Sequence, residues 1–227
     1  MGGPHPLLAP DVLSLIGARV VAPSLLLASG SRRDQAVGDV CADECWLMSL
    51  DRPPVWRSVG TNLPRRLEYT AAAPVDEMSA VCLGGWTQGS RVSDVSVFLR
   101  STHDWRKAQS LSIARNAHCA ATVRGCTFCI GGLRRPPGAA TPHDVERLSS
   151  VETAHLAADS ELAPWSAAPP LPQPRSQAAC APSGGDFAGR TATEILVCGG
   201  GGSNAGRSMP TVLLHTNDAR WTTVAEA

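Results

Sequence analysis

Short apolar runs that end in a pair of glycines recur along the chain. They are Met78–Leu83 before Gly84 and Gly85, Cys126–Ile130 before Gly131 and Gly132, and Glu194–Cys198 before Gly199 and Gly200. Runs of this length, rich in β-branched and small residues, are typical of strands buried on both faces. A glycine pair supplies positive φ or a close backbone approach where such a strand ends. The pattern predicts one core strand in each of several similar units.

A second, more loosely alternating run follows each glycine pair and leads towards a tryptophan. These second runs are Asp94–Leu99, Ser150–Leu156 and Thr211–His215. A Rossmann domain or a TIM barrel would need helical periodicity over 10–15 residues between its strands. The chain has no such periodicity, so we predict an all-β fold.

A tryptophan and an arginine ten residues later mark the units. The offset is 66 − 56 = 10, 115 − 105 = 10 and 175 − 165 = 10, and successive tryptophans lie 49, 60 and 56 residues apart up to Trp221. Periods near 50 residues indicate a repeat array. We predict an N-terminal extension, residues 1–18, followed by units at about 19–56, 66–105, 115–165 and 175–221. In the first unit, which would start at Arg19, Ser29 and Gly30 stand where the others have two glycines.

An apolar strand ending in Gly-Gly, a second strand, a polar turn, a tryptophan and an arginine ten residues later together resemble the kelch motif. Over residues 19–227 the chain resembles the kelch-repeat β-propeller family. The resemblance implies a kelch-type propeller of about four blades, incomplete or open where the ring does not close. Two features depart from the family: the usual tyrosine before the polar turn is absent, since Tyr69 lies elsewhere, and we expect no BTB domain ahead of Arg19.

The resemblance also implies structural roles for the repeated residues. The tryptophans would pack between blades rather than serve as a ligand platform, and the arginines would join the hydrogen bonds of a blade rather than bind anionic partners. The expected structural residues are Trp56, Trp105, Trp165, Trp221, Gly84, Gly85, Gly131, Gly132, Gly199, Gly200, Arg66, Arg115 and Arg175.

Composition narrows the range of partners. The formal net charge is zero and 18% of the residues are charged, so nothing favours nucleic acid or an anionic membrane. The longest apolar stretch, Val12 to Ala28, is interrupted by Arg19 and Pro23 and is too short to span a bilayer. A transit peptide is the less favoured explanation of the N-terminal residues. Most of the eight cysteines lie in apolar runs, where free cysteine behaves as a small buried hydrophobe, and we expect a reducing, cytoplasmic location.

No catalytic or metal-binding constellation emerges. The stretch 201–208 resembles a P-loop, but Arg207 replaces its lysine and no helix is expected to follow. Cys126 and Cys129 could join Cys41 and Cys45 in a zinc site, but residues three apart on a strand point to opposite faces. We therefore expect no metal, no cofactor and no enzymatic activity.

The resemblance implies a non-catalytic module that binds a protein partner through inter-strand loops, in a substrate-recognition or adaptor-like role. The expected contact loops are Gly85–Ser93, Leu133–Asp144 and Gly200–Met209. Two alternatives remain: a propeller enzyme, galactose-oxidase-like or a sugar epimerase, and a truncated relative of a BTB–kelch ubiquitin-ligase adaptor. The residues expected to contact the partner are Trp86, Arg91, Arg134, Arg135 and Arg207.

Overall fold

The computed structural model describes residues 19–21, 24–34, 38–49, 55–76, 78–141, 144–155, 163–185, 191–202 and 209–225. These residues form strands, turns and loops, and none of them lies in a helix. The prediction of an all-β fold is confirmed for this part of the chain. The predicted extension, residues 1–18, lies outside the described residues.

Four antiparallel sheets of four strands follow one another along the chain. The first contains β1 (Arg19–Val21), β2 (Ser24–Asp34), β3 (Gly38–Ser49) and β4 (Trp56–Ser58). The second contains β5 (Ala71–Pro74), β6 (Ser79–Thr87), β7 (Ser90–Leu99) and β8 (Asp104–Ala108). The third contains β9 (Cys119–Val123), β10 (Cys126–Ile130), β13 (Val151–His155) and β14 (Ser166–Ala168). The fourth contains β15 (Ala179–Ser183), β16 (Glu194–Cys198), β17 (Thr211–His215) and β18 (Arg220–Ala225). A hairpin of β11 (Leu133–Arg134) and β12 (Glu146–Arg147) lies between β10 and β13.

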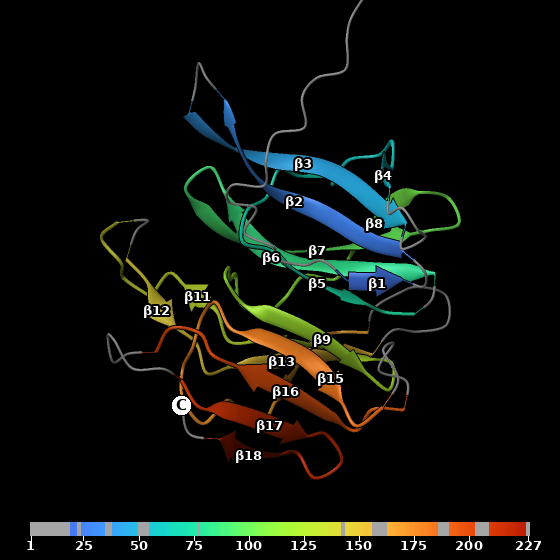
Figure 1. Cartoon of the computed structure of the whole chain (residues 1–227). Helices are drawn as coiled ribbons and strands as arrows, with labels where there is room; N and C mark the ends of the chain where they lie inside the picture. The colour runs from blue at the N-terminus through green and yellow to red at the C-terminus, as the bar shows by residue number, and fades with distance from the viewer. Residues whose placement is uncertain are drawn as a thin grey trace, which may run out of the picture.

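The sheets are arranged in chain order. In Figure 1 the blue β2 and β3 lie at the top, the red β17 and β18 at the bottom, and the second and third sheets between them. The first strands of successive sheets contact one another, β1 with β5, β5 with β9 and β9 with β15. None of the sheets closes on itself. The result is an array of four similar meanders.

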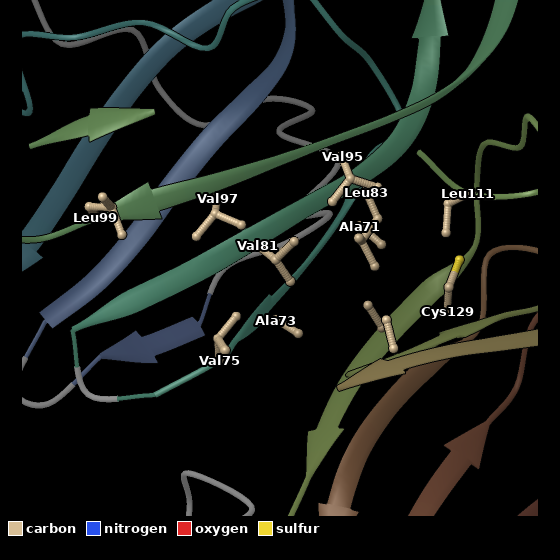
Figure 2. Close-up of a cluster of buried hydrophobic side chains, with 12 residues drawn as sticks. Ala71, Ala73, Val75, Val81, Leu83, Val95, Val97, Leu99, Leu111 and Cys129 are labelled. Carbon is tan, nitrogen blue, oxygen red and sulfur yellow. The ribbon is translucent and has the colours of Figure 1, made fainter. Parts of the chain in front are cut away.

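Apolar side chains fill the space between neighbouring sheets. Val81 and Leu83 of β6 belong to a cluster that also holds Cys129 of the third sheet (Figure 2). Cys82, between them in β6, points to the other face and packs with Cys45 of the first sheet. Burying a valine or leucine side chain stabilises a fold by about 1.5–3 kcal/mol. The continuous apolar run of β6 therefore serves two interfaces at once.

Short links join each sheet to the next and bond to both. We use the name link for the four residues before β5, β9 and β15: 67–70, 115–118 and 175–178. The Arg115 carbonyl accepts a hydrogen bond from Gly85 N (2.8 Å) in the second sheet, while its guanidinium donates to Gly131 O (2.9 Å) and Ser150 O (3.1 Å) in the third. A link thus ties two sheets together.

Arg175 repeats the arrangement of Arg115 one sheet further on. Its carbonyl accepts from Gly132 N (2.9 Å), and its guanidinium donates to Gly199 O (3.3 Å) and Pro210 O (2.9 Å). The links also bond to one another, because Ala117 N donates to Tyr69 O (2.9 Å) and Gln177 N donates to Ala117 O (2.7 Å). The same contacts therefore recur from one sheet to the next.

Two of the predicted repeat arginines do not occupy this position. In the second unit the residue four positions ahead of the first strand is Leu67, which is 5% exposed, and its neighbour Glu68 pairs with Trp86 as Asn116 pairs with Leu133. The side chain of Arg66 is 60% exposed and lies 3.6 Å from Asp43. The ten-residue offset is thus off by one here, and Leu67 is the structural counterpart of Arg115. Arg19 lies within β1 rather than ahead of it.

The repeated tryptophans lie at corresponding places near the start of each fourth strand. Trp165 donates its indole N–H to Gln109 O (2.9 Å) of the preceding repeat, and Trp221 donates to Pro169 O (2.9 Å) in the same manner. Trp105 is buried, with its ring centroid 5.2 Å from that of Phe98. Trp56 differs, since it is 42% exposed.

In the second and third sheets the first glycine of the pair lies against the following link. A Cβ on Gly84 would come within 2.5 Å of Arg115 O, and one on Gly131 within 2.6 Å of Arg175 O. Their φ angles of +54° and +65° are also positive, a region that glycine enters at little cost. The glycine pairs therefore permit both the turn and the approach of the link.

Candidate functional site

An open groove lies between the second and third sheets. Its volume is about 460 Å³, and its walls come from three separate stretches of the chain. One wall is the tip of the β6–β7 hairpin, one is the connection that leads from β8 to the Arg115 link, and one is the segment that begins with β11. The lining residues are 89–91, 112–114, 134, 135 and 137.

The β6–β7 hairpin presents Arg91 to the groove. Arg91 pairs across the strands with Trp86, and its guanidinium carbon lies 4.9 Å from the centroid of the Trp86 ring. Its Nε also donates to Asn116 Oδ1 (3.0 Å), which belongs to a link. An arginine stacked on an indole and bonded to an amide has a restricted orientation. Partial burial lowers the pKa of Arg91, but a guanidinium keeps its charge at neutral pH.

The opposite wall carries Arg134 and Arg135. Arg134 Nε forms an ion pair with Glu146 Oε2 (2.7 Å) across the β11–β12 hairpin. This hydrogen bond raises the pKa of Arg134 and lowers the pKa of Glu146. Arg135 is exposed and donates Nη2 to Ala139 O (2.9 Å) within its own loop. Both side chains are thus held at the groove by contacts outside it.

The third wall is positioned by a buried ion pair. Glu152 of β13 accepts hydrogen bonds from Ser112 N (2.7 Å) and Ile113 N (3.3 Å). The same carboxylate pairs with Arg115 Nη2 at 2.6 Å, and both side chains are at least 95% buried. This network fixes the backbone of Ser112 and Ile113 at the edge of the third sheet.

The lining of the groove is cationic, although Glu146 beside it balances part of the charge of Arg134. Three of its nine lining residues are arginines and none is acidic, although the formal net charge of the protein is zero. A concave surface lined by one sign of charge concentrates ligands of the opposite sign. Guanidinium groups in addition form paired hydrogen bonds with carboxylates and phosphates.

His118 lies in the link beside the buried ion pair and is itself buried. A Cβ on Gly84 would lie 2.9 Å from its Cε1 atom, so the ring is tightly packed between two sheets. Burial, with a smaller effect of the charge on Arg115, lowers the pKa of His118 to about 3. The imidazole is therefore neutral at physiological pH.

The structure brings together four of the five residues that the sequence analysis proposed for partner binding. Arg91, Arg134 and Arg135 line the groove, and Trp86 supports Arg91. Arg207 lies outside the described residues, as does most of the loop Gly200–Met209 and of the P-loop-like stretch.

Two parts of the groove were missed from the sequence. The backbone wall at 112–114 belongs to a polar connection that carries no motif. Glu152 could have been recognised from the sequence by one feature. It is the single acidic residue of the strand Val151–His155. A carboxylate in such a strand needs a buried cationic partner, and Arg115 is that partner.

Two cysteines of the possible zinc site, Cys126 and Cys129, lie on opposite faces of the third sheet. Cys129 packs in the cluster between the second and third sheets, whereas Cys126 packs on the opposite face, towards the fourth sheet. Among the described residues, no group of three or more His, Cys, Asp or Glu side chains is placed to hold a metal ion. The one tyrosine, Tyr69, is 40% exposed.

Within the described part of the chain there is no helix with the length and apolar character that crossing a membrane would require. No protein-family model matches this sequence, and a search of the curated proteins finds no match either.

Proposed function

We propose that the chain is a kelch-type propeller module without catalytic activity, which binds an acidic segment of a protein partner in the groove between the second and third sheets. In this role it acts in substrate recognition or as an adaptor. The observation that carries the proposal is the convergence of Arg91, Arg134 and Arg135 on one groove from two different repeats.

The repeat contacts support the kelch assignment. The glycine pairs, the tryptophans and two link arginines occupy matching places in successive four-stranded sheets. These are the residues that the kelch motif repeats. The four sheets are then blades, the links lie along the inner strands, and the insertion that carries Arg134 and Arg135 projects from one edge.

The arrangement of the arginines supports an acidic ligand. Arg91 is oriented by Trp86 and Asn116, and Arg134 by Glu146, so little side-chain entropy is lost on binding. The groove is open rather than enclosed, which suits an extended segment of a protein. The unpaired thiols of the described cysteines favour a reducing compartment, and we place the protein in the cytoplasm.

Binding of a labelled peptide tests this function. Fluorescence anisotropy would compare a fluorescein-labelled peptide of alternating Glu and Ser with the same peptide carrying Lys in place of Glu. We expect the acidic peptide to bind, and to bind more weakly as salt is raised. Replacing both Arg134 and Arg135 by Gln should weaken binding by about tenfold or more, since one charge-assisted hydrogen bond contributes roughly 1.5–3 kcal/mol.

A matched control distinguishes the effect of the groove arginines from the effect of the net charge of the protein. Arg106→Gln combined with Lys107→Gln removes the same two charges from exposed positions of β8. That variant should bind the acidic peptide as the wild type does. Equal losses in the two double variants, or equal binding of the acidic and basic peptides, would contradict the proposed function.

A further inference from the structure

Each internal sheet packs with one face on the sheet before it and with the other on the sheet after it. We call these the leading face and the trailing face. In the second sheet the leading face carries Phe98 and Trp105, which pack with Cys45 of the first sheet. The trailing face carries Val81 and Leu83, which pack towards the third sheet (Figure 2). Among the described residues, no sheet packs ahead of the first sheet and none packs after the fourth.

The leading face of the first sheet exposes two indoles. Trp56 of β4 pairs with Met48 of β3, and Trp46, two residues before Met48, lies on the same face. Trp46 is 37% exposed and Trp56 is 42% exposed, whereas Trp105, at the corresponding place in the second sheet, is 8% exposed. Among the described residues, nothing covers this face as the first sheet covers Trp105.

The trailing face of the fourth sheet is also apolar and uncovered by the described residues. Leu196, Cys198 and Leu213 stand where Val81, Leu83 and Val97 stand in the second sheet. The three residues of the second sheet are at most 1% exposed, but their counterparts in the fourth are only half-buried. An apolar sheet face that stays partly exposed where its counterparts are fully buried is suited to an interaction surface.

The glycine pair of the fourth sheet likewise lacks a neighbouring link among the described residues. A Cβ on Gly84 or Gly131 would meet the carbonyl of the following link, but a Cβ on Gly199 would meet nothing within 4 Å. The backbone of Gly199 nevertheless keeps the conformation of its counterparts, with φ of +63° against +54° and +65°. The fourth sheet is thus shaped for a neighbour that the described part of the chain does not supply.

We propose that a second copy of this chain is that neighbour, with the trailing face of the fourth sheet of each copy docked on the leading face of the first sheet of the other. The interface repeats a packing that already occurs between consecutive sheets within the chain. One end offers indoles and the other an apolar face of the type on which Trp165 and Trp221 already pack. Two such contacts close a ring of eight sheets, which lies within the range of four to eight blades found in propellers.

The mass in solution tests the proposal. Sedimentation velocity of the full chain over a range of concentrations should show a species of 47.4 kDa, twice the 23.7 kDa of one chain. Trp56→Lys and Leu196→Lys should each shift the protein to the monomer, because each places a charge in both interfaces of the ring. Met78→Lys alters a more exposed apolar residue, just before β6 of the second sheet (51% exposed), and should leave the dimer intact.

Mixing the two end variants distinguishes this pairing from any other. A Trp56→Lys chain keeps its trailing face and a Leu196→Lys chain keeps its leading face, so the mixture should form a dimer through one unmodified interface. Circular dichroism confirms that each variant is folded, and Trp46→Lys replaces Trp56→Lys if that variant is not. A monomer at all concentrations, species larger than two chains, or a mixture that stays monomeric would overturn the proposal. The Arg134 and Arg135 variants should leave the mass unchanged, so this test is independent of the groove.

Discussion

Breaking the buried ion pair between Arg115 and Glu152 should be one of the most destabilising single changes in the array. Replacing Glu152 by Val copies the residue at the corresponding place in the fourth sheet, Val212. It leaves the Arg115 guanidinium buried without its carboxylate, which was 2.6 Å away. Removing one partner of a buried pair costs about 3–5 kcal/mol. Since domains are stable by only about 5–15 kcal/mol, this is a large fraction of the total.

In the described part of the fourth sheet, the native chain has no carboxylate beside the link arginine. Arg175 Nε and Nη2 are buried without a hydrogen-bond partner among the described residues, because Val212 stands where the third sheet has Glu152. The third sheet cannot accept the same substitution without loss, since its link arginine directs three hydrogen bonds to Ser150 and Glu152.

Urea unfolding measures the effect. With an m-value of about 2–3 kcal/mol/M, the predicted loss of about 3–5 kcal/mol lowers the midpoint by roughly 1–2.5 M. Glu146→Val breaks the exposed ion pair with Arg134 and should change the midpoint little. The double variant Arg115→Met with Glu152→Val should be less destabilised than the sum of the two single variants, by up to about 3 kcal/mol. Additive losses, or a Glu152→Val midpoint equal to that of Glu146→Val, would refute the role assigned to this pair.

Three further outcomes are expected. Leu67→Arg should destabilise the fold although it restores the repeat pattern, because it buries a charge without a carboxylate, whereas Arg66→Leu should change the urea midpoint little, since Arg66 is mostly exposed. The pKa of His118 falls from 6.5 to about 3 on folding, so below pH 6.5 the unfolded chain binds a proton that the folded chain does not. The free energy of unfolding should therefore decrease as the pH drops below 6.5, by about 2 kcal/mol at pH 5. His118→Leu should lose this part of the pH dependence. Burial raises the pKa of the Cys129 thiol to about 12, so iodoacetamide should label the half-buried Cys126 before Cys129 in the native protein, as read by mass spectrometry.

The sequence predicted the class of fold and most of the repeat. Apolar runs before glycine pairs became the second strands of three sheets, and the spacing of the tryptophans located the fourth strands. These features were visible because each depends on local sequence: a strand needs its apolar residues and a tight approach needs its glycine. The exposed Trp56 was not foreseen, because the motif carries no information on whether a neighbouring sheet is present.

The register of the link before β5, residues 67–70, could not be derived from spacing alone. Arg65, Arg66 and Leu67 are adjacent, and the regular offset of ten selected Arg66, but the connection after Trp56 is one residue longer than its counterparts. Leu67 occupies the buried position, because an apolar side chain there needs no carboxylate partner. The sheet behind that link offers Ser96 at the place of Glu152, so an arginine there would have lacked its ion pair.

The groove was predicted in part for a similar reason. Arginines in glycine- and proline-rich loops could be proposed as contact residues one by one. Their convergence depends on how the β6–β7 hairpin and the β11–β12 insertion, from neighbouring sheets, lie in space. The relative position of these two segments depends on the link and on Glu152. Neither of them belongs to a loop motif.

Hydrogen exchange at two link amides tests the arrangement of the sheets most directly. Ala117 N donates to Tyr69 O and Gln177 N donates to Ala117 O, and both bonds connect the link of one sheet to the link of the next. If the sheets form one array, amide exchange followed by NMR should show both amides protected to the same degree as the β10 strand, with protection lost only on cooperative unfolding. Exchange of either amide at the rate of an exposed loop, while β10 remains protected, would contradict the arrangement.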